Sequence, residues 1–181
     1  MVYLKPVKRP TKIEAAKLAL RETFPAAQHP YFADYLEQAL NSLSDGSKQI
    51  YSICGQRFDT QAEAIFGYVL LNFAHATNVK MTAICLDSIY QDIGVGKSAL
   101  KALVSLLGDM NYRILFTQVR QYNARMMHVV ESIGFTKVGV KHHSGESADN
   151  NVYAIGLDDS VTVEDLKLEA AVIYDGFQDA E

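Results

Sequence analysis

Residues 91–98 form a glycine-punctuated segment between two apolar stretches, and they constrain the possible folds more than any other feature. The segment reads Gln91, Asp92, Ile93, Gly94, Val95, Gly96, Lys97 and Ser98. It follows a strand-like run at residues 81–86 and opens a helix-like stretch at residues 99–107. Glycines at a helix start let backbone amides converge on an anion, which the helix dipole also favours. The pattern predicts a strand, turn and helix unit that binds a pyrophosphate-bearing ligand.

Two known phosphate-binding motifs resemble this segment. Gly94 to Ser98 ends like a Walker A loop, G-x-x-x-x-G-K-[ST], but Gln91 stands where its first glycine belongs. Glutamine does not readily adopt the positive φ that such a tight turn favours. The other template, [QR]-x-x-G-x-[GA], is matched completely by Gln91, Gly94 and Gly96. At these residues the chain resembles the GNAT superfamily of N-acetyltransferases, in which this loop holds the pyrophosphate of acetyl-CoA.

A second segment, residues 123–135, also resembles the family. Asn123 suits the N-cap of a helix, and Gly134 suits a left-handed C′ position before Phe135. The family's second cofactor segment has this form, with an Asn that opens a helix ending in Gly-Phe. The resemblance extends over residues 69–157.

The hydrophobic pattern predicts an α/β chain of alternating strands and helices. We expect helices at residues 12–23 (capped by Thr11), 31–43, 99–110 and from 123, and strands at residues 2–7, 49–54, 64–73, 79–86, 113–119, 136–141 and 152–157. The resemblance implies a GNAT-like mixed, mostly antiparallel sheet flanked by helices, whose two parallel central strands splay around the cofactor. We expect one such domain at residues 1–157.

The resemblance also implies a site and a reaction. Leu86 offers backbone groups to the pantetheine and acetyl carbonyl, residues 91–98 hold the pyrophosphate, and Asn123 touches the cofactor arm. An acceptor amine then attacks the thioester of acetyl-CoA directly, with a backbone amide stabilising the developing oxyanion.

The chain departs from the family at the position of the general acid. The family commonly has a Tyr four residues before the helix-ending glycine, and this chain has Val130 there. Tyr122 is our candidate replacement, with a half-buried structural aromatic as the alternative. Asp87 is our candidate base, with an ordinary turn-forming aspartate as the alternative.

The composition of the chain argues against several other classes of protein. The chain has 181 residues, a net charge of −4 and no basic cluster interleaved with aromatics, so we expect no nucleic-acid partner. Two cysteines in predicted strands form neither a disulfide framework nor a metal set, which fits a cytoplasmic protein. The apolar run at residues 65–73 is too short to cross a membrane, and no signal peptide is expected.

Residues 158–181 form an acidic extension beyond the last expected strand. Thr162 and Asp165 predict the cap of a short helix with Val163, Leu166, Ala170 and Ile173 as an apolar stripe. We expect this helix to pack on its own domain, or alternatively at a homodimer or partner interface.

The sequence predicts an acetyl-CoA-dependent N-acetyltransferase, with three alternatives left open. They are a degenerate CoA-binding protein that acts through protein interactions, a small P-loop-like nucleotide-binding protein, and a plain structural protein. The acceptor is an amine of a protein or a small molecule.

Overall fold

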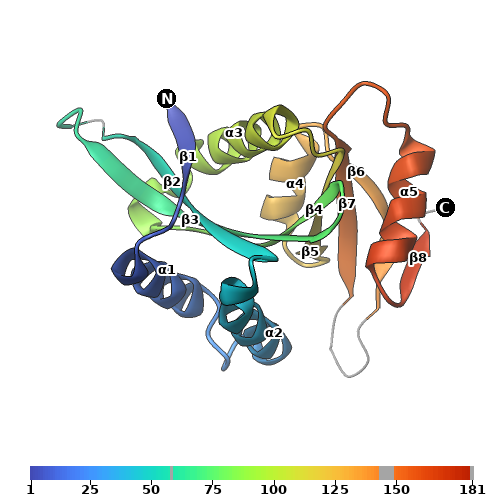
Figure 1. The fold of residues 1–181 in the computed structure, drawn as a ribbon, viewed down its shortest axis with the longest axis horizontal. Coiled ribbons are helices and arrows are strands. Elements are labelled where there is room, and N and C mark those ends of the chain that lie inside the picture. Colours follow the sequence, from blue (N-terminus) through green and yellow to red (C-terminus); the bar gives the residue numbers. More distant parts are fainter. Residues whose placement is uncertain (58, 143–148, 180–181) are drawn as a thin grey trace. The chain divides into compact units, whose positions relative to one another are not determined.

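A computed structural model describes residues 1–57, 59–142 and 149–179. The chain divides into two compact units, Met1–Ala74 with Met81–Leu103, and His75–Lys80 with Val104–Glu181. Within the described residues the strands pair mostly antiparallel, with one parallel pair. Figure 1 labels the helices and strands of both units. The predicted mixed α/β class and the mostly antiparallel sheet are therefore confirmed. The splaying of the central strands concerns parts of both units and stays a prediction.

The first unit is built on four neighbouring strands. They are β1 (Val2–Pro6), β2 (Lys48–Gln56), β3 (Glu63–His75) and β4 (Asn78–Leu86), in that order, and β4 begins in the second unit. β2 pairs antiparallel with both β1 and β3. The predicted hairpin is confirmed by the antiparallel pairing of β2 and β3, which reaches from Lys48 opposite Asn72 to Gln56 opposite Glu63; Phe58, in the predicted turn, lies outside the described residues.

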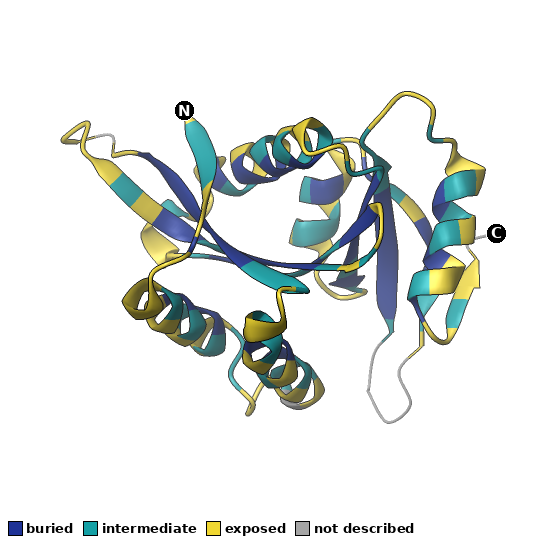
Figure 2. Ribbon diagram, in the orientation of Figure 1, coloured by how far each residue is buried: buried dark blue, intermediate teal, exposed yellow. Residues whose placement is uncertain are grey.

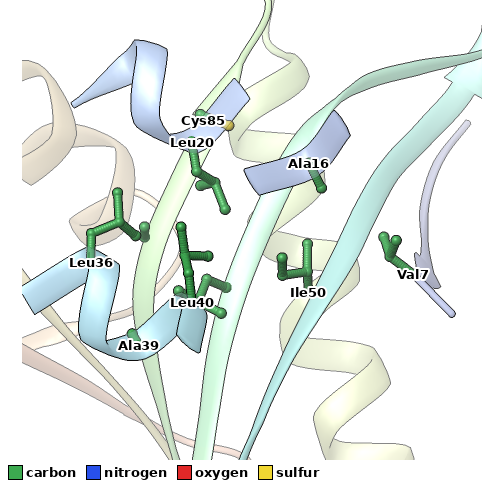
Figure 3. Packing of buried hydrophobic residues seen from close by; sticks show 10 residues of the cluster. Val7, Ala16, Leu20, Leu36, Ala39, Leu40, Ile50 and Cys85 are labelled. Atoms are coloured by element: carbon green, nitrogen blue, oxygen red, sulfur yellow. The ribbon is translucent and has the colours of Figure 1, made fainter. Parts of the chain in front are cut away.

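Two helices cover one face of these strands. They are α1 (Pro10–Thr23) and α2 (Pro30–Asn41), followed by the short 3-10 helix η1 (Ser42–Asp45). Ala16 and Leu20 of α1 and Leu36 of α2 are buried against Ile50 of β2, and Figure 3 shows this packing. Burial of these apolar side chains is the main force that holds the two helices on the sheet.

The start of α1 differs from the prediction. Thr11 does not cap the helix, because α1 already begins at Pro10 with Arg9 as its N-cap. Proline is favoured in the first helical turn, where its fixed φ suits the helix and its missing N–H costs no hydrogen bond.

The other face of the strands packs on the helix that follows the glycine loop, α3 (Val95–Asp109). Ile53 of β2 and Phe66 of β3 form a buried cluster with Val95 and Ala99 of α3. Adjacent residues on a strand point to opposite faces, so β2 serves both cores.

The second unit contains the later strands and helices. They are β5 (Ile114–Arg120), α4 (Ala124–Glu131), β6 (Thr136–Lys141), β7 (Asn150–Gly156), α5 (Val163–Ile173) and β8 (Phe177–Asp179). The strand order from the start of β4 is β5, β7, β6, β8. β7 pairs antiparallel with β5 and β6, and β6 pairs antiparallel with β8.

The acidic extension packs within this unit. Thr162 and Asp165 form the predicted capping box of α5, and Leu166 and Ala170 are buried with Phe116. Figure 2 shows buried, intermediate and exposed stretches along α5. Val163, predicted in the apolar stripe, is instead 52% exposed, because it occupies the first helical position on the solvent side. The strand β8 was not predicted from the sequence.

The end of α4 is a second difference from the prediction. Gly134 has a positive φ of 110°, as expected, but the helix already ends at Glu131, with Ser132 as the C-cap. Gly134 therefore lies beyond the C′ position, and its N–H donates to the carbonyl of Glu131. No helix in the described parts of the chain is both long and apolar enough to cross a bilayer.

Candidate active site

The end of β4 is fixed to β3 before the glycine loop begins. The backbone N–H of Asp87 donates to the carbonyl of Phe66 at 2.9 Å. The Asp87 carboxylate accepts from the N–H of Ile89 at 3.2 Å and so caps the short 3-10 helix η2 (Ser88–Tyr90). Asp87 is thus the turn-forming aspartate of our alternative reading, and it is also exposed, as a base would need to be. Its role as a base stays a prediction.

Gln91 ties the start of the loop back to the strand. Its side-chain amide donates to the carbonyl oxygen of Leu86 at 3.0 Å. The backbone of Gln91 is extended, with φ −79° and ψ 158°. Position 91 therefore does not have the left-handed conformation that would favour the missing Walker A glycine.

Two residues with positive φ turn the loop into α3. They are Asp92, with φ 61°, and Gly94, with φ 84°. A Cβ added at Gly94 would have no atom within 4 Å, so the backbone there borders open space. A Cβ at Gly96 would meet only Leu86 Cδ1, at 3.5 Å. The loop thus leaves its backbone open to a ligand.

The first turn of α3 supplies the hydrogen-bond donors. The N–H of Ser98 donates to the carbonyl of Gly94 at 3.1 Å, the first bond of the helix. By helix geometry, the N–H groups of Val95, Gly96 and Lys97 have no acceptor within α3. These amides, with the positive end of the helix dipole, form a site suited to a phosphate group. The loop therefore has the features that a pyrophosphate site needs, and binding of the pyrophosphate stays a prediction.

The side chains of the loop divide into anchors and exposed groups. Val95 is buried in the cluster with Phe66, and the ring of Tyr90 lies 4.4 Å from the ring of Phe66. Ile93, Lys97 and Ser98 are exposed. Val95 therefore positions the loop through its side chain, and only its backbone is available to a ligand.

Gly67 positions the strand end, and the sequence reading did not identify it. A Cβ at Gly67 would lie 2.0 Å from the carbonyl oxygen of Cys85 on β4. Any side chain there would push away the backbone that leads into Leu86. An isolated glycine inside a predicted strand is the signal that could have revealed this close approach.

The remaining predicted site residues belong to the second unit. Asn123 caps α4 as predicted, with its side-chain oxygen accepting from the N–H of Met126 at 3.1 Å. Tyr122 is 65% exposed, which excludes the half-buried structural aromatic of the alternative reading. Val130 has no exposed surface. The contacts of Asn123 and Tyr122 with a cofactor stay predictions.

The sequence of the chain matches a known protein family. The model of the acetyltransferase (GNAT) family matches residues 13–135, which include the whole loop and the cap of α4. The chain belongs to the GNAT family of acetyltransferases. No curated protein matches this GNAT chain in sequence.

Solved structures of GNAT proteins share the fold. The ribosomal-protein-S18-alanine N-acetyltransferase of Escherichia coli has a TM-score of 0.63 at 15% identity, covering 90% of this chain and 99% of its own. A putative GNAT acetyltransferase of Desulfovibrio desulfuricans has a TM-score of 0.66 at 16% identity, covering 87% and 100%. Spermidine N-acetyltransferase of Vibrio cholerae, solved with CoA and spermine, has a TM-score of 0.64 at 16% identity, covering 86% and 95%.

Proposed function

We propose that this GNAT protein is an N-acetyltransferase that moves the acetyl group of acetyl-CoA to an amine. The observation that carries the proposal is the open loop at residues 91–98. Asp92 and Gly94 turn it so that the first amides of α3 border open space beside the end of β4. An anion-binding helix start at this position is what the pyrophosphate of acetyl-CoA needs.

The chain's residues have the following roles in this proposal. The loop amides and Lys97 bind the pyrophosphate, and Asn123 contacts the cofactor arm. Leu86 holds the acetyl carbonyl with backbone groups, and an amide there stabilises the oxyanion as the amine attacks. Positioning alone supplies about 7–11 kcal/mol in well-oriented reactions, so few side chains are indispensable.

Two side chains handle protons in this proposal. Asp87 removes a proton from the acceptor amine through a water molecule, and Tyr122 returns a proton to the departing thiolate. A thiolate with a pKa of about 8.5 leaves without strong acid help. We therefore expect Tyr122→Phe to slow the reaction by less than about tenfold, and Asp87→Asn by about tenfold to a hundredfold.

The acceptor belongs to a broad class of amines. One structural neighbour acts on a ribosomal protein alanine and another on spermidine, as their names state. A net charge of −4 slightly favours a basic acceptor for this chain as well. We also propose a cytoplasmic location, since both cysteines, Cys54 and Cys85, are free and buried.

The test is release of CoA thiol in the presence of a panel of amines. The panel contains polyamines, lysine peptides and peptides with free amino termini, and product acetylation is confirmed by mass spectrometry. We expect amine-dependent release that Gly94→Asp strongly reduces at low acetyl-CoA concentration and that Gly46→Asp preserves. Gly46 also has positive φ, 78°, with no atom within 4 Å of an added Cβ, so it is a matched control.

One observation favours a second function, CoA binding without transfer. Val130 occupies the position where the family commonly has its Tyr acid, and its full burial leaves no room for an added group. Tight binding of acetyl-CoA with no thiol release on any amine would support this second function. A P-loop nucleotide site is not proposed, because Gln91 is extended and the family match spans the loop.

A further inference from the structure

A cavity of about 470 Å³ opens in the first unit, where β1 passes into α1. Its rim carries four cationic side chains, Lys5, Lys8, Arg9 and Lys12, and a single carboxylate, Glu63. A cavity of this volume lies within the range of small-molecule sites. No residue of the loop at 86–98 lines it.

Glu63, the carboxylate that lines the cavity, is already paired with Lys5. Glu63 forms an ion pair with Lys5 at 2.5 Å and also accepts from the hydroxyl of Tyr3. The hydrogen bonds from Lys5 and then Tyr3 lower the pKa of Glu63, which therefore stays ionised and paired. The other cations, Lys8, Arg9 and Lys12, form no ion pair with a carboxylate among the residues that the structure describes, although the charge of Lys12 also lowers the pKa of Glu63.

A buried polar side chain lies at the floor of the cavity. Ser52 of β2 is only 6% exposed, lines the cavity, and makes no side-chain hydrogen bond to the described residues. It stands opposite Lys5 in the β1 and β2 pairing. Ser52 and Ile50 are two residues apart on β2, so their side chains lie on the same face of the sheet, and Ile50 packs against α1 on that face. The Ser52 hydroxyl is not among the fully buried, unsatisfied polar atoms of the described residues, so it is open to the cavity and free to bond a ligand there.

The N-terminus of α1 offers few backbone N–H groups to an anion. Pro10 has no N–H, and the N–H groups of Lys12 and Ile13 both donate to the carbonyl of Arg9 at 2.9 Å. Few amides are therefore left for a ligand, although the helix dipole still favours negative charge at this end. Recognition at the cavity must come mainly from the side chains.

We propose that this cavity binds a small, multiply charged anion of the phosphate-ester class. Arg9 supplies the planar fork that matches phosphate oxygens, Lys8 and Lys12 supply further positive charge, and the Ser52 hydroxyl donates from the floor. The site lies on the face of the sheet covered by α1, whereas the loop precedes α3 on the other face. It is therefore separate from the proposed acetyl-CoA loop.

The probe is inorganic pyrophosphate, titrated into the protein at low ionic strength and followed by calorimetry. The variants are Arg9→Ala with Lys12→Ala, and Ser52→Ala. The matched control is Lys101→Ala with Lys137→Ala, which removes the same charge from exposed lysines outside the cavity. Gly94→Asp is included to remove anion binding at the loop. Thermal unfolding checks that every variant folds.

We expect pyrophosphate binding to survive in Gly94→Asp and in the lysine control. Loss of Arg9 and Lys12 should weaken it by about tenfold or more, and Ser52→Ala by about threefold to tenfold. Binding that disappears in Gly94→Asp would mean that the loop alone holds the anion, and would overturn the proposal. So would unchanged affinity in the Arg9 and Lys12 variant, or no binding to the wild type at about 10 mM probe.

Discussion

The side-chain amide of Gln91 donates to the carbonyl oxygen of Leu86 at 3.0 Å. This hydrogen bond joins the first residue of the glycine loop to the last residue of β4. The proposed pyrophosphate site and the proposed acetyl site are thereby held in one rigid segment.

Replacing Gln91 with Glu should weaken acetyl-CoA binding. The carboxylate cannot donate to Leu86, and it adds negative charge beside a site that holds an anion. We expect KM for acetyl-CoA to rise about tenfold with a smaller change in kcat, measured by thiol release. Gln28→Glu, on an exposed turn far along the chain, adds the same charge and should leave KM unchanged. Equal KM values for both variants would contradict this role of Gln91.

Gly67→Ala should destabilise the protein and displace the end of β4. Its Cβ would lie 2.0 Å from the carbonyl oxygen of Cys85, so the two strands must move apart. We expect a loss of about 1–3 kcal/mol in the free energy of unfolding, measured with denaturant. The control is Gly108→Ala in α3, whose Cβ would stand 3.5 Å from the carbonyl of Leu157. It should be neutral or stabilise by up to about 1 kcal/mol, because Ala is a better helix former than Gly. A Gly67→Ala protein as stable as wild type would refute the close approach.

Thr162→Ala should unfold more easily than wild type because it removes the capping box of α5. The Thr162 hydroxyl accepts from the N–H of Asp165 at 3.2 Å, and the Asp165 carboxylate accepts from the N–H of Thr162 at 2.9 Å. Loss of such a cap costs about 1 kcal/mol. Asp159→Ala, three residues before the N-cap Thr162, is the control and should change stability little. The measurement is the denaturant midpoint, and equal shifts in both variants would argue against the cap.

His142 should make stability depend on pH. Its Nε2 lies 3.0 Å from the side-chain oxygen of Gln178 on β8, and its Nδ1 lies 2.8 Å from the carboxylate of Asp149. The hydrogen bond to Gln178, and then that to Asp149, raises the pKa of His142 above its usual 6.5. A raised pKa stabilises the folded state fully below pH 6.5 and loses its effect as pH rises through the folded value.

The test of His142 is unfolding by denaturant at a series of pH values from about 5 to 9. Wild type should lose stability across the range above pH 6.5, and His142→Gln should lose less. His128→Gln, at an exposed position on α4, should keep the wild-type profile. Identical profiles for wild type and His142→Gln would contradict the raised pKa of His142 and the two hydrogen bonds that cause it.

The sequence correctly predicted those structural elements that depend only on residues close together in the chain. Asn123 and the Thr162 and Asp165 pair were correctly predicted as caps, because a short polar side chain before an apolar helix has few other uses. The loop at residues 91–98 was recognisable because its glycines and its helix are contiguous. The predicted strand at residues 136–141 matches β6.

Features that depend on tertiary contacts were not predictable in the same way. The role of Gly67 depends on the carbonyl of Cys85, and the cavity beside Arg9 depends on β2 and β3, which are distant in sequence. The short strand β8 exists because β6 offers it an edge, so its three residues carry almost no signal of their own. The predicted acceptor remains an amine of unspecified class, since the residues that would recognise it form no local pattern.

The most direct test of the central claim is calorimetric titration of acetyl-CoA into wild type, Gly94→Asp and Gly46→Asp. We expect wild type and Gly46→Asp to bind with similar Kd. Gly94→Asp should raise Kd roughly thirtyfold or more, about 2 kcal/mol, because it places a carboxylate against the pyrophosphate. Failure of wild type to bind acetyl-CoA, or equal Kd for Gly94→Asp and Gly46→Asp, would contradict the assignment of the loop as the acetyl-CoA site.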